Sequence, residues 1–582
     1  MDYRRVARAT IASALLISAF LGAFLSLSPS RRLLAAEPSS TPQPFAAVAI
    51  AGFDDLSTAL GQVAAQLGYE EQFKPMLEFA TGIDAVKKLN SAEPIAFFVA
   101  CDGNSIAPFL RVPLANEPSE DDLASFRKGC DFINEKISDK TTKTINCAYS
   151  NGALYFTIDE FLPIAVKTPY DPKTLFREAP DGAAKIVTFN VNLTKLPKEL
   201  IEAGTALLRQ KISELASDAD EDELADIEQT LEYYYGLFDS LGKVEWTLYV
   251  DQEGNIHTAS TVTHKAKSYV AENLEKSSAE QTRWSKLAET PDAIAYSVAA
   301  GIFSDQAKTY NANHFKYTIK KNLSKPLDAL KDDEVNYAFA QKLTNLFSEI
   351  LEADLQADSY DFGVAALTTP AAIFCSTTTK PNAVKEALKV AADRLKSEFP
   401  QEFEQYVKLD AEKVAGYDIS KFDASDFEGD LAQLNDYLNG KTLSIRFAVS
   451  DSAVVFAFGL GEEELDAVLR NVLEDSLHRA PQPNRSVFDL SKLAALIANE
   501  TIALREAKAE DPDARAFFEV VDLVANAENA VLTTTQEVNK NVIKTDSVFP
   551  AEIVKLIGEA IPIIADRNIE DSGQDLDDIF DE

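Results

Sequence analysis

The sequence is poor in the residue types that most often build reactive centres. Among 582 residues there are four cysteines, four histidines, two methionines and two tryptophans. No Cys-x-x-Cys, His-x-x-x-His or Gly-x-Ser-x-Gly pattern occurs, and those spacings are typical of zinc sites and serine nucleophiles. We therefore predict no catalytic set, no cofactor and no dedicated metal site. The histidines that would have to share a metal are widely spaced: His257, His264, His314 and His478.

Long apolar runs are missing after the first 28 residues. Residues 11–28 form the one such run, with Arg4, Arg5 and Arg8 before it and small residues up to Ala36 after it. This order is typical of a secretory signal, so we expect residues 1–36 to be removed and residues 37–44 to form a flexible lead. The alternative is an uncleaved N-terminal anchor, because the run approaches the length that spans a bilayer. Export to the periplasm, cell envelope or medium is predicted.

Basic residues are few beside acidic ones. Lysine and arginine number 56 against 93 aspartates and glutamates, which gives a net charge of −37. Residues 1–36 hold five arginines and one aspartate, so the remaining chain carries −41. Because such a charge repels phosphate groups, we expect no nucleic-acid partner and no strong binding to anionic membranes. Weak binding of divalent cations remains an expectation.

The sequence does contain an internal similarity. Residues 144–157 match residues 444–457 without a gap, and residues 191–208 match residues 488–505, at offsets of 300 and 297 residues. Two matches in the same order at nearly one offset indicate an ancient duplication of a unit of roughly 250–300 residues.

Apolar residues alternate in short runs that turn-forming residues separate. The turn Ser150-Asn151-Gly152 is typical of a hairpin. Leucine stripes after Asn192 and Asp489, the expected N-caps, predict amphipathic helices. The predicted fold class is α+β, an internally duplicated unit of antiparallel sheets and hairpins covered by amphipathic helices. Strand pairs are predicted within residues 95–112, 145–158, 244–262, 362–376, 444–457 and 530–548.

Polar and proline-bearing stretches divide this pattern. The first copy is predicted over residues 45–288, with sub-units of about 45–180 and 184–288. The second copy is predicted over residues 292–568, with sub-units of about 292–480 and 486–568. Residues 569–582 are expected to form an acidic, disordered tail.

The N-terminal part of the mature chain carries a distinctive order of motifs. A short strand leads into Phe53-Asp54-Asp55-Leu56 and a helix, followed by residues 77–89, Glu93-Pro94 and a strand ending at Cys101-Asp102-Gly103. Over residues 45–115 this resembles a group of uncharacterised exported proteins of planctomycete-type bacteria. The resemblance implies a compartment and a lineage, and it brings no catalytic residues with it.

One glycine turn has the setting of a nucleotide site. Gly459-Leu460-Gly461 follows a predicted strand and begins a helix, but Glu464 stands where a dinucleotide fingerprint requires its third glycine. The glutamates at 462–464 would repel a pyrophosphate, whereas they suit the positive end of a helix dipole. We therefore interpret this segment as a structural turn.

An acidic run fits a calcium loop only in part. Asp218, Asp220 and Asp222 occupy the first three ligand positions, but Glu223 and Gln229 replace the required glycine and glutamate. A helix cap with an acidic first turn is the better interpretation, and weak cation binding is the alternative.

For three weaker patterns we prefer a structural explanation to a functional site. Ser125 and Lys128 have the spacing of penicillin-recognising enzymes without the companion motifs, which indicates a solvated helix face. Residues 233–235, three tyrosines, cannot share one helical face, so core packing is favoured over a sugar platform. Four sequons matter only outside bacteria, and they lie at Asn192, Asn322, Asn484 and Asn499.

The cysteines leave one question open. Cys130 lies on the helix before the strand that holds Cys147, and the pair could form a disulfide in an oxidising compartment. The alternative is that both remain buried free thiols; the other two cysteines are Cys101 and Cys375.

Three functions are compatible with these patterns. The leading hypothesis is a non-catalytic binding or scaffold module of the cell envelope, in which the duplicated units present a surface or groove. The alternatives are a hydrolase that uses paired carboxylates and a carrier of an apolar ligand held between a curved sheet and its helices. A closed apolar cavity would favour the carrier, and two buried facing carboxylates would favour the hydrolase.

Overall fold

The computed structural model divides into two compact units. Unit 1 comprises Met1–Ala65 and Tyr69–His264, and unit 2 comprises Gln66–Gly68 and Lys265–Glu582. The predicted signal lies outside the described residues. The structure describes residues 42–572 except 83, 102–105, 138–142, 172–173, 197–200, 203–205, 207–209, 211–220, 279, 291, 369–370, 399, 425–441, 480–483 and 509–510.

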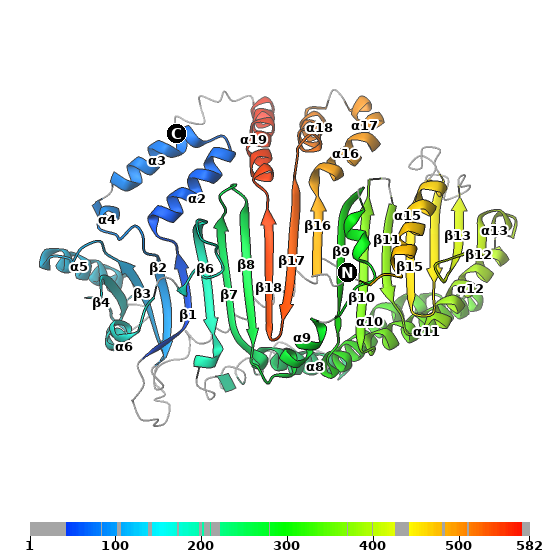
Figure 1. Cartoon of the computed structure of the whole chain (residues 1–582), viewed down its shortest axis with the longest axis horizontal. Coiled ribbons are helices and arrows are strands. Elements are labelled where there is room, and N and C mark those ends of the chain that lie inside the picture. Colours follow the sequence, from blue (N-terminus) through cyan, green and yellow to red (C-terminus); the bar gives the residue numbers. More distant parts are fainter. Residues whose placement is uncertain are drawn as a thin grey trace. The chain divides into compact units, whose positions relative to one another are not determined.

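Both units combine strands and helices in mixed order, as an α+β fold predicts (Figure 1). The strands of unit 1 are β1 (Gln43–Ile50), β2 (Ile95–Cys101), β3 (Ile106–Pro113), β4 (Ile145–Ser150), β5 (Ala153–Ile158), β6 (Ala184–Asn192), β7 (Leu241–Val250) and β8 (Ile256–His264). Its helices are α2 (Phe53–Gln66), α3 (Glu70–Gly82), α4 (Asp84–Lys87), α5 (Glu120–Ile137), η1 (Asp159–Phe161), α6 (Leu162–Lys167), η3 (Leu193–Lys195) and α8 (Glu221–Ser240).

Unit 2 has the same mixture with longer helices. Its strands are β9 (Ala293–Ile302), β10 (Ser359–Leu367), β11 (Ala371–Thr377), β12 (Val407–Val414), β13 (Tyr417–Ala424), β14 (Leu443–Val449), β15 (Ala453–Leu460), β16 (Asn484–Asp489), β17 (Val531–Asn539) and β18 (Val542–Phe549). Its helices are α9 (Tyr269–Ser277), η4 (Ser285–Glu289), α10 (Asp305–Ala329), α11 (Glu334–Leu355), α12 (Pro381–Glu398), α13 (Pro400–Tyr406), α15 (Glu462–Asp475), α16 (Leu490–Glu500), α17 (Ile502–Ala507), α18 (Pro512–Ala525) and α19 (Ala551–Ser572).

Strand pairing follows one order in both units, and every pair described within a unit is antiparallel. In unit 1 the order is β4-β5-β3-β2-β1-β6-β7-β8. In unit 2 the order is β14-β15-β11-β10-β9-β16-β17-β18, with the hairpin β12-β13 added beside β14. The two units therefore share a topology, and unit 2 is wider by one hairpin.

The registers of the matched segments also correspond. Ile145 pairs with Ile158, and Ile445 pairs with Phe458, 300 residues further on in each strand. At the second match, Val191 pairs with Ala46, and Phe488, 297 residues later, pairs with Ala295. The sequence similarity therefore marks positions that occupy equivalent places in the two ladders.

Local sequence signals explain most of these elements. Asn151 and Gly152 have φ of 49° and 76°, which is the conformation that a two-residue hairpin turn requires. Asn192 caps η3 by accepting a hydrogen bond from the amide of Thr194, and Asp489 caps α16 by accepting one from the amide of Lys492. The predicted hairpins and both predicted caps are confirmed.

Two predicted helix and tail boundaries differ from the structure. The helix expected after Asn192 begins as the short 3-10 helix η3, because Leu196 is extended; residues 197–200 lie outside the description. Residues 569–572 of the expected tail belong to α19, which continues to Ser572; the rest of the expected tail lies outside the described residues. No described helix combines the length and apolar character that crossing a bilayer requires.

The hairpin β12-β13 is the least regular part of the unit 2 sheet. Its register shifts between Lys408 and Glu412, and Asp410 has a positive φ of 46°. Among the described strands only β13 pairs with β12, so β12 is an edge strand.

Candidate functional site

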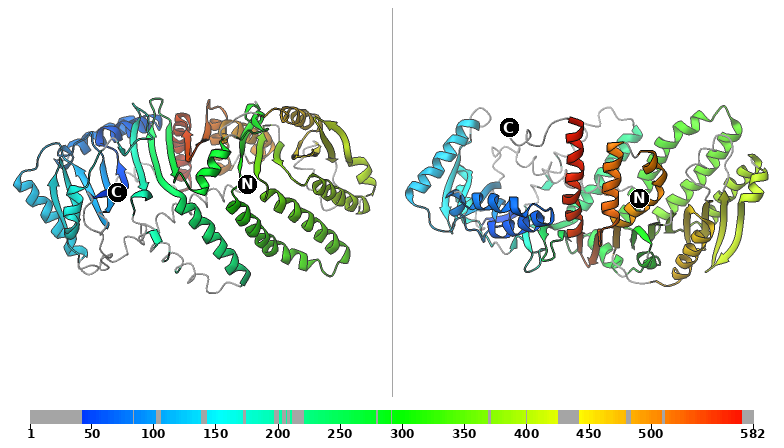
Figure 2. Two further views of the ribbon diagram at one scale, coloured as in Figure 1. Left: turned by 60° about the horizontal axis from the view of Figure 1, so that its bottom comes forward. Right: turned by 90° about the horizontal axis from the view of Figure 1, so that it is seen from above.

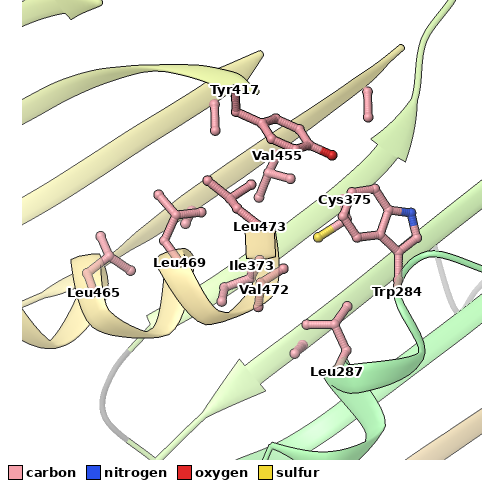
Figure 3. Close-up of a cluster of buried hydrophobic side chains, with 14 of the residues drawn as sticks. Trp284, Leu287, Ile373, Cys375, Tyr417, Val455, Leu465, Leu469, Val472 and Leu473 are labelled. Carbon is pink, nitrogen blue, oxygen red and sulfur yellow. The ribbon is translucent and has the colours of Figure 1, made fainter. Parts of the chain in front are cut away.

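The two faces of the unit 2 sheet differ in how they are covered. Along β15, residues alternate between fully buried and partly exposed positions. On the buried face, Leu465, Leu469 and Leu473 of α15 pack against Ile373 and Val455 (Figure 3). The i, i+4 spacing of the leucines places them on one side of the helix, so α15 seals this face. Trp284 and Leu287 complete the same cluster.

The opposite face presents aromatic side chains that remain partly open. Phe374 of β11 is 43% exposed and Phe458 of β15 is 40% exposed, although both strands lie inside the sheet. The rings of Phe374 lie 6.1 Å from Phe456 and 6.4 Å from Phe458 between centroids, and the Phe447 and Phe456 rings are 4.9 Å apart. We call this set the aromatic face. Its defining residues are Phe374, Phe447, Phe456 and Phe458.

Among the described residues, the helix that contacts this face lies at its β13-β14 side. α12 packs against β14, and Lys385 of α12 pairs with Asp418 of β13 at 2.6 Å. α11 packs along α12, and α10 packs along α11, side by side in Figure 2. Salt bridges join these helices to one another, such as Lys342 to Glu386 at 2.9 Å. Their packing leaves Phe374 and Phe458 open.

Unit 1 presents an apolar surface at the equivalent face. Phe97 of β2 is 38% exposed, and Val48 and Ile50 of β1 are 41% and 50% exposed. Leu110 pairs with Phe156, just as Phe374 pairs with Phe456 in unit 2. The open face is therefore apolar in both units, and it is richer in aromatic rings in unit 2.

Charged residues are buried on the other side of the sheets, where helices meet strands. Arg446 is fully buried and donates through Nε to Asp466 at 2.5 Å and through Nη1 to Asp423 at 2.7 Å. Lys421 joins Asp466 at 2.6 Å and Glu412 at 2.9 Å. Burial opposes ionisation of Asp466, but the hydrogen bonds from Arg446 and Lys421 hold its pKa below the usual value. This network docks α15 on β13 and β14.

Unit 1 has a smaller buried charge cluster. Arg111 of β3 donates to Glu93 at 2.9 Å, and its guanidinium lies 3.7 Å from the centre of the Tyr170 ring. Burial raises the pKa of Tyr170. Nε and Nη1 of Arg111 have no hydrogen-bond partner among the described residues. The stacking of the guanidinium on Tyr170 offsets part of the cost of burying its charge.

Asp361 is the buried carboxylate closest in character to a catalytic acid. Burial raises its pKa, as in many general acids. Its oxygens accept hydrogen bonds from Thr282 at 2.6 Å and from the amide of Arg283 at 2.9 Å, and Trp284 Nε1 donates to its carbonyl. These bonds fasten residues 282–284 to β10, which is a packing role.

The glycine turn before α15 is filled by the protein itself. Gly461 precedes the helix with φ of 98°, a conformation that favours glycine. A Cβ at this position would lie 2.5 Å from Oε2 of Glu464. A carboxylate thus occupies the space beside the helix terminus, which agrees with the structural-turn interpretation.

The other sequence candidates are scattered. Asp218 and Asp220 lie outside the described residues. Ser125 and Lys128 are exposed on α5, and Tyr234, on α8, is 38% exposed with its ring 5.7 Å from that of Tyr233. Of the sequons, Asn322 lies on α10, Asn484 on β16 and Asn499 on α16.

The histidines and cysteines also occupy separate places. His257 contacts Asp251 at 3.1 Å, and His264 contacts Ser240 at 2.9 Å. Among the described residues, no three histidine, cysteine or acidic side chains gather in a way that could hold a metal ion. All four cysteines are buried thiols, and of these only Cys130 and Cys147 are described as interacting with each other.

Sequence reasoning missed the aromatic face, although the sequence shows that both sides of its strands are apolar. The strands β11 and β15 read AAIFCST and AVVFAFGL, with apolar residues at both odd and even positions. Such runs are typical of strands buried on both faces. No family model, curated protein or solved structure matches the chain.

Proposed function

We propose that the protein is an exported, non-catalytic binding protein that holds an uncharged apolar ligand on the aromatic face of unit 2. The observation that supports this function most is the exposure of Phe374 and Phe458 in the middle of a sheet. Exposed apolar surface of this kind commonly marks a binding site. Export is supported by the order of charged, apolar and small residues in the first 36 positions.

The chemistry of the face favours an uncharged ligand. On the side of the sheet that carries Phe374, the residues of β10, β11 and β15 are apolar or bear a hydroxyl group. The charged side chains of Arg446 and Lys421 lie on the opposite side. Aromatic rings bind flat or chain-like apolar groups through large contact areas. The chain's net charge of −37 disfavours an anionic ligand.

Unit 1 supports the same function in a second site. Its open face carries Val48, Ile50 and Phe97 at the surface. The shared strand order and registers favour an origin of the two units by duplication, and the resemblance over residues 45–115 favours a place among exported planctomycete-type proteins. A duplicated unit that keeps an apolar face in both copies is consistent with a shared binding role.

Titration with a neutral apolar dye, N-phenylnaphthylamine, tests this function. We expect the purified full chain to bind the dye, and the double variant Phe374→Ser and Phe458→Ser to bind it about tenfold more weakly, because about 1.4 kcal/mol of contact is lost. Phe517→Ser is the matched control, since Phe517 is 54% exposed on α18 of the same unit. Equal losses in both variants, or no dye binding, would contradict the proposal.

A further inference from the structure

Two cysteine side chains meet between α5 and β4 in unit 1. Cys130 and Cys147 are 2% and 4% exposed, and each lies close enough to the other to influence its pKa. α5 packs directly on β4. The pair is therefore enclosed between a helix and a strand.

Asn134 fixes the relative position of these two elements. Its amide nitrogen donates to the carbonyl of Ile145 at 2.9 Å, and its side-chain oxygen accepts from the Ile145 amide at 2.8 Å. Cys130 lies four residues before Asn134, on the same side of the helix. Cys147 lies two residues after Ile145, on the same side of the strand. The paired bonds thus hold the two thiols opposite each other.

Burial makes the folded thiols slow to react from outside. It raises the pKa of Cys130 to about 12, with a further contribution from Cys147, and it also raises the pKa of Cys147. The thiolate is the nucleophile in disulfide exchange. A bond between these cysteines would therefore form while the chain folds and before α5 closes over β4.

We propose that Cys130 and Cys147 form a disulfide during folding of the exported chain, and that it stabilises unit 1. The step is thiol–disulfide exchange with an external disulfide oxidant. One thiolate attacks that disulfide and releases one thiolate from it; the second cysteine then attacks the mixed disulfide and releases the other. Two thiols of the protein lose two protons and two electrons, and the oxidant becomes two thiols. The inference uses export alone and does not depend on the ligand.

Mass spectrometry of the exported full chain tests the bond. The protein is denatured without reductant, alkylated and digested. We expect Cys101 and Cys375 to be alkylated and one peptide pair to join Cys130 to Cys147 until reductant is added. In the Cys130→Ser variant, Cys147 should become alkylated, whereas Cys375→Ser should leave the linked pair intact. Alkylation of all four cysteines, or a different pair, would overturn the proposal.

Thermal unfolding of the wild-type chain with and without reductant measures the stabilising effect, and a double variant controls for other effects of the reductant. We expect reductant to lower the unfolding midpoint of unit 1 in the wild-type chain by roughly 5–10 °C, as a closed loop of this moderate size predicts. The Cys130→Ala and Cys147→Ala double variant should unfold at the same temperature with and without reductant. An unchanged wild-type midpoint on reduction would contradict a stabilising disulfide.

Discussion

At the scale of single residues, burial decides what the ionisable groups can do. His264 lies at the end of β8, buried against Ser240. Burial lowers its pKa, because a charged imidazole loses hydration inside the protein. The same physical cause raises the pKa of Asp361. In both cases burial disfavours the charged form of the group.

The lowered pKa of His264 predicts a pH dependence of unit 1. In the unfolded chain a histidine takes up a proton near pH 6.5, whereas folded His264 does so only at lower pH. The unfolded state therefore binds more protons below about pH 6.5, and stability falls as the pH drops through that value toward the folded pKa. We expect the unfolding midpoint of unit 1 to decrease between about pH 7.5 and pH 5.5.

The variant His264→Gln tests the origin of this slope. Glutamine keeps a hydrogen-bonding group near Ser240 but cannot take up the proton, so the midpoint should depend less on pH. His478→Gln, in the turn after α15, serves as the control and should keep the wild-type slope. Equal slopes in His264→Gln and the wild type would show that other groups cause the effect.

At the scale of elements, the buried ion network holds α15 on the sheet together with its leucine contacts. Arg446→Ala would leave Asp423 and Asp466 without their main partner. Loss of one partner from a buried network costs about 3–5 kcal/mol. Arg470→Ala removes a guanidinium that pairs with Glu412 but is 47% exposed, and should cost about 0–1 kcal/mol.

Hydrogen exchange across residues 462–475 measures this difference. We expect Arg446→Ala to speed exchange throughout α15, while Arg470→Ala leaves it close to the wild-type rate. Denaturant unfolding gives the corresponding free energies. Similar exchange in the two variants would mean that the leucine contacts alone dock the helix.

Elements with local signals could be predicted from the sequence, and others could not. The hairpin at Asn151 could be predicted because Asn-Gly favours the backbone conformation of a tight turn. The start of α16 could be predicted because Asp489 is a typical N-cap residue. The hairpin β12-β13 was not predicted, although Val407, Leu409 and Ala411 of its first strand alternate with charged residues; the burial of β12 does not follow this alternation. The sequence did not decide whether Cys130 and Cys147 are neighbours, because their separation depends on how α5 docks on β4 through Asn134 and Ile145.

At the scale of the whole molecule, acidity sets the response to salt. A net charge of −37 makes the compact state repel itself. Raising the salt from about 10 mM to about 150 mM shortens the screening length from roughly 30 to roughly 8 Å. We expect the unfolding midpoint to rise over this range.

Sodium and choline chloride should raise the midpoint equally, because screening depends on ionic strength and not on the cation. Calcium should add a small, non-saturating effect at millimolar concentration. A saturating rise at micromolar calcium would show a defined site and would contradict the interpretation of the acidic run at Asp218 as a helix cap.

The exposure of the aromatic face could not be predicted from the sequence. Apolar residues on both sides of β11 and β15 indicate burial on both faces, and periodicity carries no information about which face a helix covers. In the part of the chain that the structure describes, that outcome depends on α12, which packs at the β13-β14 side. The open face is thus a property of tertiary packing.

The irregular edge strand β12 affects the tendency of the protein to aggregate at high concentration. A free strand edge is a template on which other chains can add strands and aggregate. Four of the eight residues of β12 are charged, namely Lys408, Asp410, Glu412 and Lys413, and the strand breaks its register among them. A second molecule that tried to extend the sheet would meet these charges and a bent backbone. The hairpin β12-β13 therefore also disfavours the addition of strands from other molecules at this edge of unit 2, and with it fibril formation.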